Sequence, residues 1–281
     1  MRTLPLKLLS PAKLNLRLIV GKKRKDGYHA IETLFERISL CDVIRLRSYA
    51  GAVRVESDSP GIPKGPSNLA RRAADILKKT TGCRRGCVIR IEKRIPVRAG
   101  LGGGSSNAAT VLVGLNRLWK LGLSRKALLR LGAELGSDVP FFLLEKPFAV
   151  GRGRGEKLTA VRAGRRRFWH CVVKPPFSLS TRGVYRNFDR LTPPRPDARI
   201  IVRDPLSQPL FNSLEVAVNN RVITIRAIKD ELIRRGARSA LMSGSGSCVF
   251  GIFDGKAAAQ KAARDLRKAH RTWRTFAVHT F

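Results

Sequence analysis

The sequence predicts an α+β protein, and three observations lead to that fold class. Hydrophobic residues make up 43% of a 281-residue chain, which is ordinary for a globular protein and enough to bury a core. Apolar runs of strand length occur at 14–20 and 88–92, whereas the apolar residues after position 107 recur at helical spacing. No internal repeat of about 20–50 residues is present. The length allows one large domain or two lobes.

The first half of the chain contains the clearest elements. The segment LNLRLIV at 14–20 predicts a strand, and VIRIE at 88–92 predicts a second strand that leads into a glycine-rich loop. The helix after this loop should bury one face, formed by Ala108, Val111, Leu112, Leu115 and Leu118. Ser105 or Ser106 is a suitable amino-terminal cap for that helix.

A further helix should follow, with Ser124 as its cap and Gly136 at its end. Asp138 then lies two residues before Pro140, on backbone that is not easily helical at both neighbouring positions. This position can display a carboxylate. Capping of the next helix is the alternative role for Asp138.

The carboxy-terminal part begins with a proline-rich segment at 191–209, which predicts a long loop within or between lobes. The stretch from Asn212 to Glu215 resembles a capping box, so a helix is expected from there to Arg235 and Gly236. Helix capping is therefore an alternative role for Asn212.

A second glycine cluster at 243–247 precedes an apolar strand expected at 248–253, and a plain turn is the alternative role of this cluster. A basic helix is expected from residue 256 to about residue 269. Its buried side should be formed by Ala258, Ala262 and Leu266.

The composition is strongly basic, because 56 Lys and Arg residues against 20 Asp and Glu residues give a formal net charge of +36. Such a charge attracts polyanions, including nucleotides, nucleic acids and anionic membrane surfaces. Basic runs such as 22–25 and 165–167 are short, and the charges are spread along the chain. This distribution favours a solvated basic surface.

No apolar stretch approaches the roughly 20 residues needed to cross a bilayer, and basic residues and proline interrupt the amino-terminal segment, so no signal peptide is expected. A cytoplasmic protein is therefore expected. Five scattered cysteines fit a reducing compartment. Cys83 and Cys87 lack the second pair or the nearby histidine of a zinc site, so ordinary thiols are expected. No HExxH motif supports a zinc hydrolase.

The most informative segment is PVRAGLGGGSSNAA, from Pro96 to Ala109. Glycines allow positive φ and close approach to a ligand, and a helix start offers unpaired N–H groups at the positive end of a dipole. This combination suits an anion, above all a phosphate group. The loop has no GK[ST] motif. The chain also lacks a GxGxxG with its paired acidic residue and the HRD and DFG elements of protein kinases.

PVRAGLGGGSSNAA closely resembles the phosphate-binding motif of the GHMP kinases, which phosphorylate small alcohols with ATP. SPAKLNL near the start and LMSGSGSCVFG near the end resemble the first and third motifs of that family, in the right order. The resemblance implies an α+β kinase of two lobes. Residues 1–158 would form an ATP-binding lobe like domain 2 of ribosomal protein S5, and residues 159–281 a ferredoxin-like lobe.

Within this family, KDGYHAIETLF, LGSDVPFFL, GRGRGE and FNSLE resemble the branch that phosphorylates the 2-hydroxyl of 4-diphosphocytidyl-2-C-methyl-D-erythritol, in the non-mevalonate route to isoprenoids. The DGYH element discriminates best, because mevalonate, homoserine and galactose kinases lack it in that place. Two alternatives remain: a GHMP kinase for a different small alcohol and, more distantly, a basic RNA-binding protein without catalysis.

The resemblance also implies roles for individual residues. Lys13 and Asp138 correspond to the catalytic pair, with Asp138 at the substrate hydroxyl. The residues that match the ATP phosphate loop are Pro96, Ala99, Gly100, Leu101, Gly102, Gly103, Gly104, Ser105 and Ser106. The residues that match the substrate site are Asn15, Tyr28, His29, Tyr185 and Asn212, with two of the aromatic rings on opposite faces of the cytosine.

ATP and Mg²⁺ are the implied cofactors, and the loop serines are the best candidates for metal ligands. The implied partner is a small molecule, the cytidine diphosphate-linked methylerythritol. Neither a specific nucleic acid nor a membrane is expected as a partner, and the chain should be a monomer or a weak homodimer. Arg98 stands where the family commonly has a small residue, so its side chain either adds a phosphate contact or points to solvent.

Overall fold

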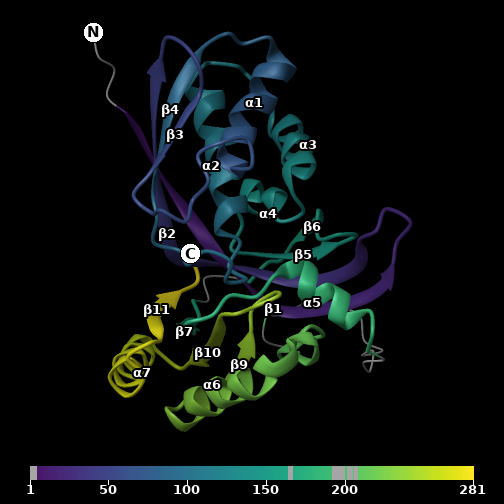
Figure 1. Cartoon of the computed structure of the whole chain (residues 1–281), viewed down its shortest axis with the longest axis vertical. Helices are drawn as coiled ribbons and strands as arrows, with labels where there is room; N and C mark the ends of the chain where they lie inside the picture. Colours follow the sequence, from purple (N-terminus) through teal and green to yellow (C-terminus); the bar gives the residue numbers. More distant parts are fainter. Residues whose placement is uncertain (1–4, 164–166, 192–199, 201–204, 206–207) are drawn as a thin grey trace. The chain divides into compact units, whose positions relative to one another are not determined.

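The computed structural model describes residues 5–163, 167–191, 200, 205 and 208–281, and the chain divides into two compact units (Figure 1). The first unit consists of Met1–Ala12, Leu40–Val97 and Gly102–Lys146, and the second of Lys13–Ser39, Arg98–Leu101 and Pro147–Phe281. The units interleave along the chain because two long strands, β1 (Leu6–Lys23) and β2 (His29–Tyr49), contribute residues to both. The boundary expected at residue 158 stays a prediction.

Strands and helices are mixed in both units, which confirms the α+β class. The first unit also contains β3 (Arg54–Ser57), α1 (Leu69–Thr81), β4 (Gly86–Glu92), α2 (Gly103–Leu118), α3 (Arg125–Leu135) and α4 (Val139–Leu144). The second unit contains β5 (Phe148–Arg152), β6 (Lys157–Ala160), β7 (Trp169–Lys174), α5 (Thr181–Phe188), β8 (Phe211–Asn212), η1 (Glu215–Ala217), η2 (Asn219–Arg221), α6 (Val222–Arg234), β9 (Ser239–Met242), β10 (Val249–Phe253), α7 (Lys256–Ala269) and β11 (Arg274–His279).

In the first unit, β4 lies between β2 and β3, antiparallel to β2 and parallel to β3. The register pairs Ile44 with Ile91 and Val55 with Ile89, so alternate apolar side chains of the three strands share one face. Helices α1 to α4 pack against one another beside this sheet (Figure 1). The strands expected at 14–20 and 88–92 are confirmed, and the first is longer than predicted.

The helix after the glycine loop is confirmed, but its start is not where the sequence predicted. Ala108, Val111, Leu112 and Leu115 are buried as expected, whereas Leu118 is partly exposed. The amino-terminal cap is Gly102 in the left-handed conformation, with φ of 67°. A glycine adopts this conformation without steric cost, so the helix begins before the two serines. Capping by Ser105 or Ser106 is therefore wrong, because both lie inside the first turn.

Helix α3 matches its prediction at both ends. The Ser124 hydroxyl accepts a hydrogen bond from the Ala127 amide at 3.3 Å, and Gly136 follows the last helical residue. Asp138 then occupies the cap position of α4, but its side chain makes no capping hydrogen bond. Helix capping, the alternative role for Asp138, is therefore not what its carboxylate does.

The second unit contains a four-stranded antiparallel sheet with the order β11-β7-β10-β9. Helices α6 and α7 cover the same face of this sheet (Figure 1), where Leu232 and Leu266 pack with Cys171, Val173 and Val249. Of the four strands in chain order, the second (β9) and the last (β11) lie at the edges of the sheet. This is the arrangement expected of a ferredoxin-like lobe.

The capping box expected at Asn212 to Glu215 is wrong as a helix start, because α6 begins only at Val222. Both side chains instead bind the end of β9. The Asn212 amide donates to the carbonyl oxygen of Met242 at 2.8 Å, and a Glu215 oxygen accepts from the Met242 amide at 2.7 Å. These bonds tie the segment to the sheet, and two 3-10 turns follow before the helix.

Helix α7 runs from Lys256 to Ala269 as expected, but its buried side is shifted, because Ala258 is exposed and Ala259 is buried. Most of the proline-rich segment at 191–209 and of the triplet at 165–167 lies outside the described residues. All five cysteines are free thiols. Within the described part of the chain, no group of three acidic, histidine or cysteine side chains could hold a metal ion, and no helix is long and apolar enough to cross a membrane.

Candidate functional site

The glycine-rich loop is shaped by residues in the left-handed conformation. Gly100 has φ of 77° and Gly102 has φ of 67°, which only glycine adopts readily. Ala99 and Leu101 alternate with these glycines and are buried, as is Pro96 at the start of the loop. The apolar side chains of the loop are therefore buried, whereas Gly102 and Gly103 are partly exposed and Gly104 is exposed.

The second glycine cluster holds residues 99–101 of this loop in place. The Ser243 hydroxyl donates to the carbonyl oxygen of Gly100 at 3.0 Å, and the Cys248 amide donates to that of Ala99 at 3.1 Å. A Cβ atom on Gly100 would lie only 2.0 Å from the Ser243 carbonyl oxygen. Cluster 243–247 is therefore more than a plain turn, because any side chain at Gly100 would disrupt the contact.

The first turn of α2 fits a phosphate group. The first amides of a helix have no intrahelical acceptor, and Gly102 has no side chain that could satisfy them. No acidic residue occupies the first turn, so the positive end of the dipole is not neutralised. Gly103, Gly104 and Ser105 thus present their N–H groups together. These residues fit the phosphate tail of a nucleotide.

The two loop serines differ in what their hydroxyls can reach. Ser106 is fully buried, and its Oγ accepts a hydrogen bond from the Ser10 hydroxyl at 2.8 Å. Ser105 is partly exposed. Ser105 is therefore the better candidate for a ligand of a nucleotide-bound metal ion.

Lys13 is buried and begins a chain of hydrogen bonds on β1 and β2. Only 4% of the residue is exposed, and its ammonium donates to Oδ1 of Asn15 at 2.5 Å. The Asn15 amide in turn donates to the Thr33 hydroxyl at 2.7 Å, which donates to the Arg17 carbonyl oxygen. The Lys13 ammonium also lies 5.6 Å from the centre of the Phe35 ring. These contacts fix the direction of the lysine side chain.

The expected cytidine residues His29 and Tyr185 are brought together by the fold. Their ring centres are 5.2 Å apart and tilted by 31°, although one residue lies on β2 and the other on α5. Phe188 packs edge-on against the same imidazole, with ring centres 6.1 Å apart. Nε2 of His29 lies 2.7 Å from an Asp189 carboxylate oxygen, which fixes the ring orientation.

Tyr28, the other expected stacking residue, presents a largely exposed ring. Of this residue, 54% is exposed, and the Arg154 guanidinium lies 5.0 Å from the ring centre. A cation at this distance is attracted by the aromatic face. Stacking of Tyr28 on a cytosine opposite Tyr185 stays a prediction.

Asn212 lies deep in the second unit, with 6% exposure. Its amide nitrogen donates to the carbonyl oxygens of Met242 and Gly244, both at 2.8 Å, and Oδ1 accepts from the Leu214 amide. The side chain therefore shapes the second glycine cluster. Direct contact of Asn212 with a substrate stays a prediction.

Asp138 and Lys13 belong to different units, so their cooperation stays a prediction. Asp138 is partly buried and is followed by Pro140 in the first turn of α4. Arg98 is exposed, as the solvent-facing alternative expects, and has φ of 51°. This left-handed conformation explains why a small residue is easier to place there.

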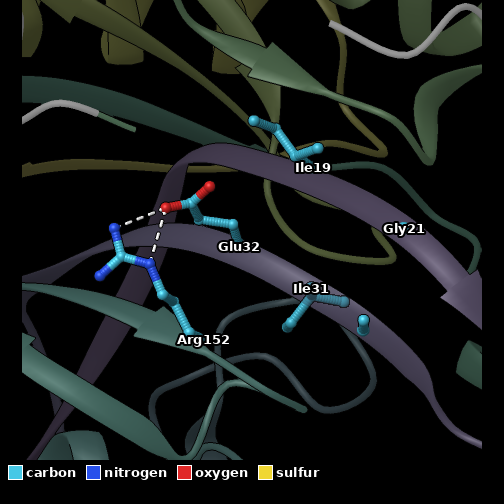
Figure 2. A pocket seen from close by; sticks show the side chains of 6 residues that line it. Ile19, Gly21, Ile31, Glu32 and Arg152 are labelled. Atoms are coloured by element: carbon cyan, nitrogen blue, oxygen red, sulfur yellow. Dashed lines mark hydrogen bonds and ion pairs between the residues drawn. The ribbon is translucent and has the colours of Figure 1, made fainter. Parts of the chain in front are cut away.

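A pocket of about 490 Å³ lies on the β1–β2 hairpin (Figure 2). It is lined by Ile19, Gly21, Ala30, Ile31, Glu32 and Arg152. The Arg152 guanidinium donates to one Glu32 oxygen through Nε at 2.9 Å and Nη2 at 2.7 Å. The acidic and basic side chains that line the pocket, Glu32 and Arg152, thus pair with each other. None of the expected site residues lines this pocket. The pocket does not fit a nucleotide phosphate.

Two residues that the structure joins to the expected site, Thr33 and Asp189, could not be singled out from the sequence. Thr33 lies at alternating spacing from His29 on a strand, so the periodicity places both on one face. Asp189 lies four residues after Tyr185, which is neighbouring spacing on a helix. Neither signal is specific by itself, because many threonines and aspartates stand at such positions.

Comparisons with known proteins agree with the motifs. The model of the GHMP kinases N terminal domain matches residues 68–146, and that of the GHMP kinases C terminal matches residues 207–272. The chain is 46% identical to a 4-diphosphocytidyl-2-C-methyl-D-erythritol kinase of Citrifermentans bemidjiense, over 98% of this chain and 99% of that protein.

Solved structures are similar as well. A crystal structure of 4-(cytidine 5'-diphospho)-2C-methyl-D-erythritol kinase superposes with a TM-score of 0.81 and 35% identity, covering 98% of this chain and all of that one (100%). A homoserine kinase from Cytophaga hutchinsonii shares the fold, with a TM-score of 0.73 and 17% identity over 99% of this chain and 95% of that one. The chain therefore belongs to the 4-diphosphocytidyl-2-C-methyl-D-erythritol kinase family of the GHMP kinases.

Proposed function

We propose that this protein transfers the γ-phosphoryl group of ATP to the 2-hydroxyl of 4-diphosphocytidyl-2-C-methyl-D-erythritol, giving the 2-phosphate and ADP in the non-mevalonate route to isoprenoid precursors. The observation that carries the proposal is the contact of His29, from the discriminating DGYH element, with Tyr185 at 5.2 Å between ring centres. Near full-length similarity to named kinases of this substrate supports it.

The nucleotide is bound through its phosphates. The N–H groups of Gly103, Gly104 and Ser105 offer fixed donors, and the end of the helix dipole adds positive potential. Donors that are already in place need no reorganisation as negative charge develops in the transition state. Phosphoryl transfer passes through a loose, charged transition state, so alignment and charge stabilisation supply most of the catalysis.

Lys13 and Asp138 act on the acceptor alcohol in this proposal. The hydroxyl oxygen forms a bond to the γ-phosphorus while the bond from that phosphorus to the bridging oxygen of ADP breaks. Asp138 orients the hydroxyl and accepts its proton late in the transfer, because an ordinary carboxylate is a weak base. Lys13, held by Asn15, screens the negative charge that develops on the transferred group.

Tyr28 and Tyr185 would hold the cytosine by stacking, which is worth about 1–3 kcal/mol per base. His29 presents one edge of its ring to Asp189, which leaves its other nitrogen to face the substrate. Asn15 and Asn212 complete the substrate site, the second through the cluster at 243–247 that it supports.

Mg²⁺ would be held mainly by the nucleotide, with the Ser105 hydroxyl as the protein group that reaches it. When bound, Mg²⁺ neutralises charge on the phosphate oxygens. The donor set fits this weak form of binding, because the described residues offer no cage of acidic side chains. We further propose that the protein acts in the cytoplasm as a monomer or weak homodimer, which sizing chromatography of the pure chain would test.

An acceptor panel tests the proposed function. The full chain is incubated with ATP and, separately, with 4-diphosphocytidyl-2-C-methyl-D-erythritol, mevalonate and homoserine, and ADP release is measured. Turnover of the first compound is expected, with a phosphorus NMR signal that places the new phosphate on the 2-hydroxyl. Turnover of mevalonate or homoserine alone would reject the assignment.

A further inference from the structure

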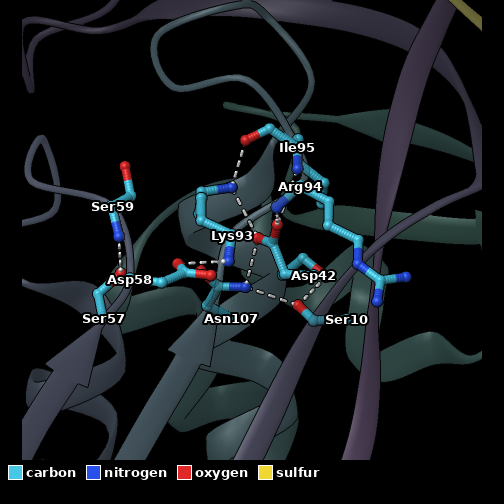
Figure 3. Close-up of polar contacts among 10 residues, drawn as sticks. Ser10, Asp42, Ser57, Asp58, Ser59, Lys93, Arg94, Ile95 and Asn107 are labelled. Carbon is cyan, nitrogen blue, oxygen red and sulfur yellow. Dashed lines mark hydrogen bonds and ion pairs between the residues drawn. The ribbon is translucent and has the colours of Figure 1, made fainter.

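Asp42 is a fully buried carboxylate that none of the proposed catalytic steps uses. It lies on β2 with 0% exposure and accepts four hydrogen bonds (Figure 3). Oδ1 accepts from the backbone amides of Arg94 and Ile95, both at 2.8 Å. Oδ2 accepts from the Lys93 ammonium at 2.7 Å and from the Asn107 amide at 2.9 Å. Each oxygen is therefore bound by two donors.

All four donors come from segments that flank the glycine-rich loop. Residues 93–95 directly precede Pro96, where the loop begins, and Asn107 lies in the first turns of α2, just after the loop. One carboxylate thus binds the chain before and after the phosphate-binding segment. Strand β2 supplies a rigid base for it, because its register with β4 pairs Val43 with Glu92 next to this point.

The same network extends to a loop serine. The Ser10 hydroxyl accepts from the Asn107 amide at 2.8 Å and donates to the Ser106 hydroxyl at 2.8 Å. Figure 3 shows Ser10 from β1, Asp42 from β2, Lys93 from the segment after β4 and Asn107 from α2 converging. The bonds from Asp42 therefore continue into the first turn of the helix that presents its amides to phosphate.

The negative charge of Asp42 also offsets a positive charge that lies beside the start of α2. The Lys93 ammonium lies against the start of α2, since a Cβ on Gly103 would be only 3.1 Å from Nζ. A cation beside a helix amino terminus is unfavourable, and the Lys93 side chain is only 6% exposed. The Asp42 carboxylate, 2.7 Å from the ammonium, compensates this buried charge.

We propose that Asp42 is a positioning residue for nucleotide binding, which fixes both ends of the glycine-rich loop so that its amides are oriented before the nucleotide arrives. The inference rests on the proposed function, because it assumes that this loop binds ATP. It assigns to Asp42 no contact with the substrate. An oriented loop loses little freedom when phosphate binds, so the gain appears as nucleotide affinity.

The variant D42N tests the proposal. An amide can accept on only one atom, so two of the four donors lose their acceptor while the shape is kept. ADP affinity, measured by calorimetry on the full chain, should fall by about tenfold, and the KM for ATP should rise in parallel. The KM for the cytidine diphosphate substrate should stay within about twofold, since its proposed contacts lie elsewhere.

D58N is the matched control. Asp58 accepts from the Lys93 backbone amide at 2.9 Å but is exposed and binds neither Asn107 nor the ammonium. ADP affinity of D58N should equal that of the unmodified chain. Unchanged ADP affinity in D42N would overturn the proposal. An equal rise in the KM for ATP and in the KM for the cytidine diphosphate substrate would also overturn it.

If D42N does not fold, N107A decides the question, because it removes the bond to α2 and leaves the ion pair with Lys93 intact. A selective loss of ADP affinity in N107A supports the proposal, and unchanged affinity rejects it. The proposed function fails separately: a chain that binds ADP but does not phosphorylate the cytidine substrate rejects that function and leaves the role of Asp42 standing.

Discussion

The imidazole of His29 is held by the carboxylate of Asp189, with Nε2 and Oδ1 2.7 Å apart. His29 is 8% exposed and its ring also contacts Tyr185 and Phe188. A hydrogen bond to one ring nitrogen fixes the orientation of the imidazole and determines whether the other nitrogen carries a proton. Asp189 thus fixes the orientation of the His29 ring, which belongs to the DGYH element.

Removal of this carboxylate should weaken substrate binding selectively. In D189N the amide keeps the shape but loses the charge, so His29 is less firmly oriented. We expect the KM for the cytidine diphosphate substrate to rise about threefold to tenfold, while the KM for ATP stays unchanged. Steady-state kinetics with each substrate varied in turn measures the difference. D265N, which breaks an exposed pair with Lys261, is the control and should change neither constant.

The same carboxylate makes stability depend on pH. Partial burial by itself raises the pKa of Asp189, but hydrogen bonds from Lys23 and His29, with their charges, hold that pKa below its ordinary value. A lowered carboxyl pKa adds stability above the unfolded-state pKa of about 3.9, and this stability is lost as the pH falls through the folded-state pKa. In urea unfolding, the free energy of unfolding of the unmodified chain should exceed that of D189N from about pH 7 to pH 5, and this difference should decrease as the pH falls below about pH 4. A difference in unfolding free energy that increases as the pH falls would contradict the lowered pKa of Asp189.

Phosphoryl transfer should depend on Asp138. The variant D138A is expected to lose about 10³-fold in kcat, because the hydroxyl is no longer oriented and its proton has no acceptor. The thermal midpoint of D138A, measured on the same preparation, checks that the variant is folded. The exposed Glu134 on α3 offers a control, E134Q, that should keep full activity. Activity of D138A equal to that of the unmodified chain would remove Asp138 from the mechanism.

Stacking by Tyr185 should be visible in a pair of variants. Y185F keeps the ring, so the KM for the cytidine diphosphate substrate should change by less than about threefold. Y185A removes the ring, and a loss of about 1–3 kcal/mol corresponds to about a fivefold to 150-fold increase in that KM. A similar increase in both variants would show that the hydroxyl, and not the ring, makes the contact.

The cysteines should react very unequally. Burial raises the pKa of Cys87, Cys171 and Cys248 to about 12, so their thiolates are scarce at neutral pH. Cys41 is also buried, whereas Cys83 is partly exposed. Mass spectrometry after brief iodoacetamide treatment should find one label, on Cys83. Equal labelling of Cys87 would contradict its burial.

The sequence predicted the segments whose pattern is local. Helices α3 and α7 repeat apolar residues at helical spacing, and the ends of α3 lie where its cap Ser124 and its terminal Gly136 indicate. The start of α2 was missed because the left-handed backbone of Gly102 caps it, and backbone conformation leaves no side-chain signal. The capping box at Asn212 failed because its side chains bind β9, a partner that is close only after folding.

The candidate site divides in the same way. The phosphate loop could be predicted, because glycines before a helix have a direct physical meaning. Asp42 and Thr33 could not, because each acts through hydrogen bonds to residues distant in sequence, such as Asn107 and Asn15. A buried aspartate on a strand gives no pattern that separates it from an exposed one.

In the proposed mechanism, Asp138 and Lys13 act on one hydroxyl that faces the γ-phosphate bound by the glycine-rich loop. The most direct measurement is a crystal structure of the chain with a non-hydrolysable ATP analogue and 4-diphosphocytidyl-2-C-methyl-D-erythritol bound together. We expect the 2-hydroxyl within hydrogen-bond distance of the Asp138 carboxylate, roughly 2.6–3.2 Å, and in line with the terminal phosphorus. A complex in which that hydroxyl is remote from Asp138, or in which the phosphates avoid the amides of Gly103 and Gly104, would contradict it.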